Sequence, residues 1–222
     1  MKSGKMRFKG IVFDLDGTLL DTLEDIGDAV NRTLDGQGFP VHETDAYRFF
    51  IGDGFLKLMT RALPEHERAS ETIDRCMEIF RSDYGQHWAR KTRLYPGIAD
   101  MLDGLIDRGL KLAVLSNKAH DLTRTVVAKL LPHWKFHAVL GQRSGIPPKP
   151  DPYGALEIAR NLDLAPSDFL YLGDSAVDMK TAVAAGMFPV GACWGFRPAE
   201  ELKESGSKVL IDKPMEIFDL LD

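Results

Sequence analysis

The 222-residue sequence has little cysteine, no excess of positive charge and no long apolar run. Cys76 and Cys193 are far apart and form no CxxC pair, so buried, reduced thiols are favoured over a disulfide or a reactive site. A net charge of −5 disfavours binding of nucleic acid through its phosphate backbone. We therefore expect no nucleic-acid partner. No stretch of 18 apolar residues is present, so we also expect no membrane span.

The amino-terminal residues do not have the pattern of a secretory signal. Their basic residues precede an apolar run that Asp14 and Asp16 interrupt, and such a run cannot serve as the apolar region of a signal peptide. Together with the cysteine usage, this pattern predicts a cytoplasmic protein. The basic residues in question are Lys2, Lys5, Arg7 and Lys9.

The most informative feature that is present is the stretch Asp14-Leu15-Asp16-Gly17-Thr18. It follows the apolar run at 10–13, which has no polar alternation and is typical of a strand buried on both faces. Two carboxylates at the end of such a strand carry a desolvation cost that a cation would offset. A turn cap is the structural alternative, and a metal-assisted reaction centre is favoured.

Strand and helix patterns alternate along most of the chain, which predicts an α/β protein with a doubly wound, mostly parallel, Rossmann-like sheet. The expected strands lie at 8–14, 111–116, 136–140, 169–172, 188–193 and 209–211. The expected helices between and after them lie at 98–106, 121–131, 152–162, 176–185 and 215–221.

Residues 21–93 break this alternation, because their apolar residues recur only at helical spacing. Asp21 with Glu24 is typical of a capping box that would begin the first of these helices. We therefore expect an inserted all-helical cap domain at 21–93, and a core domain made of 1–20 and 94–222.

Polar residues stand at the expected carboxyl ends of three strands, after residues 13, 115 and 172. Ligands of doubly wound sheets bind at this edge. Each group has a simpler explanation: Ser116-Asn117 as a turn, Asp174 to Asp178 as a helix cap, and Lys149 as a solvated lysine. Four polar groups at the same edge of one sheet nevertheless favour a shared site.

In order, these residues resemble the four motifs of the haloacid dehalogenase-like phosphohydrolases. Asp14-x-Asp16-Gly17-Thr18 matches the first, Leu115-Ser116-Asn117 the second and Lys149 the third. The fourth is matched by Gly173-Asp174-Ser175-x-x-Asp178, and the helical insert resembles the small helical cap of that family.

The resemblance implies an aspartyl-phosphate mechanism with Asp14 as nucleophile and Asp16 as general acid and then base. It implies Mg²⁺ held by the Asp14 carboxylate, the Asp16 carbonyl and Asp174, with Asp178 acting mainly through water. Lys149 would offset the charge of the carboxylates and the phosphate. Residues that would bind the substrate in the core are Thr18, Ser116 and the backbone amide of Asn117.

In the insert, Gly52-Asp53-Gly54 resembles the cap loop of phosphoglycolate phosphatases, although Asp53 could also cap the next helix. The expected substrate is a small phosphate ester, with 2-phosphoglycolate, cleaved to glycolate and phosphate, the best guess. Thr22-Leu23-Glu24-Asp25 departs from the usual pattern of those enzymes and leaves the substrate open. The alternatives are a phosphatase for a sugar phosphate or pyrophosphate, a phosphomutase, and a disfavoured non-enzymatic binding protein. The oligomeric state is not indicated.

Overall fold

The computed structural model describes residues 8–221. The predicted core domain therefore includes residues, 1–7 and 222, that lie outside the described part. The chain divides into two compact units: one comprises Met1–Leu19 and Leu94–Asp222, and the other comprises Leu20–Arg93. Short strands β2 (Leu20–Asp21) and β3 (Arg93–Leu94) pair with each other where the chain passes between the units.

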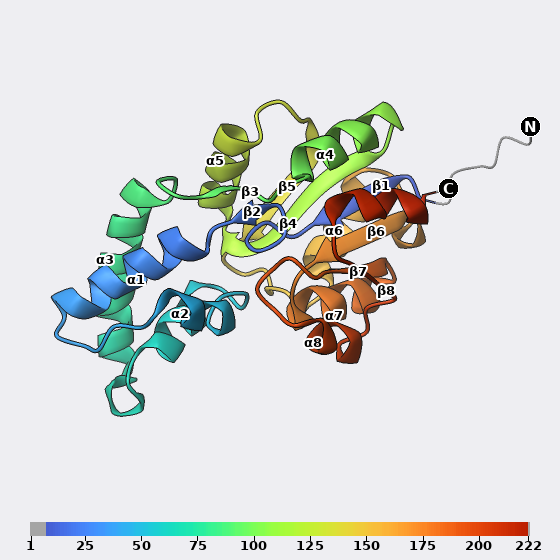
Figure 1. Ribbon diagram of the computed structural model, residues 1–222. Helices are drawn as coiled ribbons and strands as arrows, with labels where there is room; N and C mark the ends of the chain where they lie inside the picture. Colours follow the sequence, from blue (N-terminus) through green and yellow to red (C-terminus); the bar gives the residue numbers. More distant parts are fainter. Residues whose placement is uncertain (1–7, 222) are drawn as a thin grey trace, which may run out of the picture. The chain divides into compact units, whose positions relative to one another are not determined.

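The larger unit is built on a six-stranded sheet in the order β5-β4-β1-β6-β7-β8, and every pairing in it is parallel (Figure 1). This order confirms the predicted doubly wound sheet. Its strands are β1 (Gly10–Phe13), β4 (Lys111–Ala119), β5 (Phe136–Gln142), β6 (Phe169–Gly173), β7 (Phe188–Ala192) and β8 (Val209–Ile211).

β1 lies in the middle of this sheet because its residues are apolar on both faces, and all four of them are buried. Phe13 pairs with Val114 of β4 on one side and with Leu172 of β6 on the other. The backbone N–H of Asp14 then donates to the Leu172 carbonyl at 2.9 Å. The chain order reverses around β1, so the carboxyl ends of β1, β4 and β6 meet at the topological switch point.

Helices cover both faces of the sheet. α6 (Tyr153–Asn161) and α7 (Ala176–Ala185) share a buried apolar cluster with the central strands. Right-handed crossovers place α4 (Ile98–Asp107) and α5 (His120–Leu130) on the other face. Gly109 follows α4 at the C′ position, in a left-handed conformation at φ 75° that glycine adopts easily. The remaining elements are η3 (Pro166–Asp168), α8 (Ala199–Glu204) and η4 (Pro214–Leu220).

The second unit is helical and has an apolar core of its own. Leu58, Phe80 and Tyr84 are buried in it, and the Phe80 and Tyr84 rings stack with their centroids 5.3 Å apart. Its elements are α1 (Leu23–Gly36), η1 (Thr44–Phe49), α2 (Phe55–Ala62), η2 (Glu65–Glu67) and α3 (Ser70–His87). No helix within residues 8–221 is long and apolar enough to cross a membrane.

Several local predictions were wrong. Thr22, not Asp21, precedes α1, and it makes no side-chain cap bond. The carboxylate of Asp25, in the first turn, instead accepts the backbone N–H groups of Lys91 and Thr92 at 2.9 and 2.8 Å. Cys193 lies just past β7 and is only partly buried. The predicted terminal helix is present as the 3₁₀ helix η4.

Candidate active site

Lys149 is the central cation of the site at the carboxyl ends of β1, β4 and β6. Its Nζ donates to Asp14 Oδ1 at 2.8 Å and to Asp178 Oδ1 at 2.7 Å. Both carboxylates and the ammonium are buried. Because neither acid can reach water freely, one lysine stabilises two anions that sit on different elements.

Asp174, which follows β6, completes a cluster of three carboxylates. One oxygen each of Asp14, Asp174 and Asp178 lies within 4.8 Å of the others. Three buried acids face the single ammonium of Lys149, which leaves an excess of negative charge. Hard oxygen donors in this number fit a divalent cation, so the residues present fit the metal that the sequence motif implies.

The pKa values of the cluster reflect this excess of negative charge. Burial, with the neighbouring Asp178 carboxylate, raises the pKa of Asp174 to about 7. Burial and Asp178 likewise raise the pKa of Asp14 well above its usual range. Burial acts to lower the pKa of Lys149, but the charges of Asp14 and Asp178 outweigh it and hold that pKa well above its usual range.

Asp174 is fixed by neighbours on both sides. Thr18 Oγ1 donates to its Oδ1 at 3.0 Å, and the Phe196 N–H donates to its Oδ2 at 2.7 Å. Gly195 must be glycine here, because a Cβ would lie 2.2 Å from the Asp174 Cβ. Gly17 has φ +89° and would place a Cβ 2.3 Å from Asp174 Oδ2. The Thr18 side chain is fully buried, and its hydroxyl helps to orient this carboxylate. Substrate binding by Thr18 stays a prediction.

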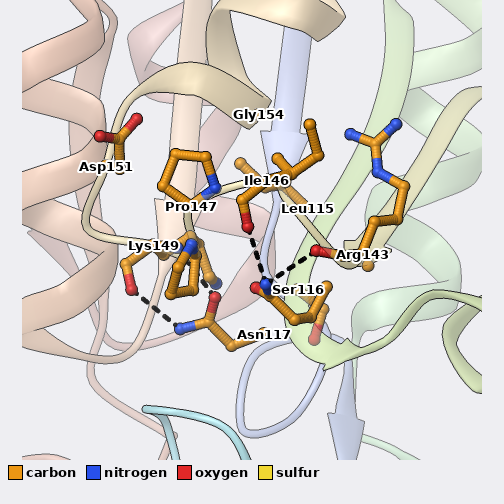
Figure 2. Close-up of a pocket in the computed structure, with 12 residues that line it drawn as sticks. Leu115, Ser116, Asn117, Arg143, Ile146, Pro147, Lys149, Asp151 and Gly154 are labelled. Carbon is orange, nitrogen blue, oxygen red and sulfur yellow. Dashed lines mark hydrogen bonds between the residues drawn. The ribbon is translucent and has the colours of Figure 1, made fainter.

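The loop that carries Lys149 is held by Asn117, as Figure 2 shows. The Asn117 side chain donates to the Lys149 carbonyl at 3.1 Å and accepts the Lys149 N–H at 2.9 Å. Asp151, two residues on, accepts the N–H of Tyr153, the first residue of α6, at 2.9 Å. Ser116 and Asn117 lie inside β4, which is longer than predicted, and both are buried beside Lys149.

Asp178 has a structural role besides its contact with Lys149. It forms a capping box with Ser175, whose Oγ donates to Asp178 Oδ2 at 2.6 Å. Because Oδ1 faces Lys149 and Oδ2 faces Ser175, the start of α7 and the acidic cluster share one carboxylate. The helix-cap alternative is therefore confirmed for this segment, and its role in a metal site stays a prediction.

Asp16 lies apart from the three clustered acids and has its own cation. Its Oδ1 accepts a hydrogen bond from Nζ of Lys118, the last but one residue of β4. Nothing in the linear spacing indicated Lys118 as the partner of Asp16. The contact joins residues 102 positions apart, and the sheet order β4-β1 brings them together.

In the helical unit, Asp53 does not cap α2. Gly54 precedes that helix, and the Asp53 carboxylate pairs instead with Arg61 at 2.6 Å and Lys57 at 3.6 Å. Burial acts to raise the pKa of Asp53, but the hydrogen bond and charge of Arg61 outweigh it and hold the pKa below its usual value. Substrate binding by Gly52, Asp53 and Gly54 stays a prediction.

Comparisons with known proteins agree with this fold and site. The family model of haloacid dehalogenase-like hydrolases matches residues 11–192. A phosphoglycolate phosphatase of Psychrobacter arcticus is 32% identical over 94% of this chain and 90% of its own length. Another, from Chromobacterium violaceum, is 29% identical over 96% of both chains.

Solved structures show the same arrangement of elements. A crystal structure from Lactobacillus delbrueckii subsp. bulgaricus has a TM-score of 0.91 and 30% identity, covering 97% of this chain and 99% of its own. A predicted phosphoglycolate phosphatase from Haemophilus somnus has a TM-score of 0.90 and 27% identity, covering 99% and 100%. The chain belongs to the haloacid dehalogenase-like hydrolase family.

Proposed function

We propose that this protein is a Mg²⁺-dependent phosphatase that hydrolyses a small phosphate monoester, with 2-phosphoglycolate as its substrate. The observation that carries the proposal is the contact of Lys149 with Asp14 and Asp178 beside Asp174. This arrangement provides a nucleophile, a cation and a set of oxygen donors at one sheet edge. The choice of 2-phosphoglycolate is supported by similarity to phosphoglycolate phosphatases, which are about 30% identical to this chain over nearly its whole length.

In the proposed reaction an Asp14 carboxylate oxygen attacks phosphorus as the bond to the leaving oxygen breaks. Asp16 gives its proton to that oxygen, and the product alcohol departs from an aspartyl-phosphate. Water then attacks phosphorus and loses a proton to Asp16, which releases phosphate and restores Asp14. Lys149 holds the phosphoryl oxygens in a site that its own loop makes rigid.

Mg²⁺, held by the carboxylates of Asp14 and Asp174 and the carbonyl of Asp16, would offset negative charge on the phosphoryl group when bound. Asp178 would act on it through water, because Lys149 and Ser175 already contact its two oxygens. Ser116 and the Asn117 amide are proposed to bind the remaining phosphoryl oxygens. The cytoplasmic location stays a prediction, supported by two cysteines that form no disulfide.

The test is a panel of small phosphate esters compared by kcat/KM, with release of inorganic phosphate as the readout. We expect 2-phosphoglycolate to be preferred over sugar phosphates and pyrophosphate. Preference for another ester by a wide margin would refute the substrate, and isomerised product in excess of phosphate would identify a mutase. Full activity in EDTA would refute the metal.

A further inference from the structure

Lys118 is a second buried cation at this edge of the sheet. Its side chain is 1% exposed, and its Nζ contacts Asp16 Oδ1. Lys149 already serves Asp14 and Asp178. The two lysines therefore divide the acids between them, and Asp16 is the one that Lys118 contacts.

The backbone of Lys118 is fixed on several sides, so its side chain leaves β4 in a set direction. Its N–H donates to Ser116 Oγ at 3.1 Å, and its carbonyl accepts Thr123 Oγ1 at 3.1 Å. Gly141 of β5 lies so close that a Cβ there would be 2.5 Å from the Lys118 carbonyl oxygen. Preorganisation of this kind is what a group needs in order to hold a reactive side chain in place.

The contact leaves the two oxygens of Asp16 in different situations. Oδ1 accepts the Lys118 ammonium, whereas Oδ2 accepts no hydrogen bond from any residue between 8 and 221. A buried ion pair is weak evidence for stability, since its desolvation cost offsets much of the attraction. This ion pair involves Asp16, the carboxylate that is proposed to transfer a proton, and so a functional role is favoured over a structural one.

We propose that Lys118 is a positioning residue that holds Oδ1 of Asp16, so that Oδ2 faces the leaving oxygen of the substrate. The proton on Oδ2 then passes to that oxygen as its bond to phosphorus breaks. This inference rests on the proposed phosphatase function. It also implies that Lys118 keeps the net charge of the site low enough for a phosphate dianion to enter.

Lys118 is thus expected to affect both phosphate binding and proton transfer by Asp16. The two effects can be separated by comparing substrates with different leaving groups. Loss of its charge weakens binding of every phosphate by a similar factor. Loss of its hold on Asp16 slows only substrates whose leaving oxygen needs a proton. The alkoxide of 2-phosphoglycolate needs one, whereas acetyl phosphate expels a carboxylate that is stable without it.

The experiment measures kcat/KM of Lys118→Met with Mg²⁺ for both substrates. General acids contribute about 10²–10⁴-fold, so we expect 2-phosphoglycolate to lose at least about tenfold more than acetyl phosphate. Lys118→Arg keeps the charge, so its KM for both substrates should return to the wild-type value. The extra loss of kcat/KM for 2-phosphoglycolate should be partly restored. Lys9→Met is the matched control, because it also breaks a lysine–aspartate pair, with Asp168, but at the opposite ends of the strands. It should leave kcat/KM unchanged for both substrates.

Equal losses on the two substrates, or no loss on either, would overturn the proposal. If Lys118→Met does not fold, Lys118→Gln is measured in the same way, with the same results for and against. A wild-type enzyme that hydrolyses neither substrate would refute the proposed function itself. A wild-type enzyme active on both, with an unchanged ratio in the folded variants, would refute only the role of Lys118.

Discussion

Replacing Lys149 with methionine should make stability depend on pH in a defined direction. The Lys149 side chain is 4% exposed and is the cation for Asp14 and Asp178. Removing one partner of a buried ion pair costs about 3–5 kcal/mol, because the remaining charges are left uncompensated. We expect the metal-free Lys149→Met variant to lose about this much free energy of unfolding at about pH 8.

The sign of the pH dependence follows from the raised carboxyl pKa values. A carboxyl group whose pKa is higher in the folded state binds more protons folded than unfolded, so stability falls as pH rises through that interval. For Asp174 the interval runs from its ordinary pKa of 3.8 to about 7. Loss of the ammonium raises these pKa values further, so the variant should recover stability on acidification more steeply than the wild type.

The assay is chemical denaturation in EDTA at about pH 5 and about pH 8, where linkage predicts the smaller and the larger loss respectively. Lys9→Met is again the control, since a partly exposed pair contributes about 0–1 kcal/mol and should show no such trend. An equal loss for Lys149→Met at both pH values would refute the view that it compensates clustered, partly protonated acids.

Three further predictions concern metal binding and the predicted substrate-binding loop. Because the pKa of Asp174 is about 7 without metal, protons compete with the cation, and calorimetric titration should show Mg²⁺ binding weaken as pH falls through that value; affinity independent of pH would contradict this. Gly195→Ala should weaken Mg²⁺ binding about 10–100-fold by displacing Asp174. Gly36→Ala, which meets nothing within 4 Å, should leave that binding unchanged, and equal effects in the two variants would refute the argument. Asp53→Asn should raise KM for 2-phosphoglycolate with little change in kcat, and an unchanged KM would remove the predicted loop contact.

Much of the fold could be predicted because the relevant signals are local. The strand at 10–13 and the strand at 169–173 are continuous apolar runs, and only burial on both faces suits them. Gly109 marked the end of its helix through the left-handed conformation that glycine adopts most easily. The sequence predicted the last helix but not its type, because a short segment at 214–220 carries no pattern that separates 3₁₀ from α geometry.

The site was only partly predictable, for a different reason. The strand-end rule predicts that Asp14 and Asp174 come near each other, and the structure places them in one cluster. The strand-end rule does not predict which lysine contacts which carboxylate. The contacts of Lys118 with Asp16 and of Asn117 with the Lys149 backbone depend on strand order and loop path. The contact of the Thr18 hydroxyl with Asp174, 156 residues away, could not be predicted from the sequence either.

The most direct test of the mechanism is to look for the phosphoryl group on Asp14. Enzyme mixed with 2-phosphoglycolate and Mg²⁺ is quenched in acid during turnover and digested, and the peptides are analysed by mass spectrometry. We predict one phosphoryl group on the peptide that contains Asp14, and neither label nor turnover in a folded Asp14→Asn variant. Turnover without label on Asp14, or near-normal activity of Asp14→Asn, would contradict its role as the nucleophile.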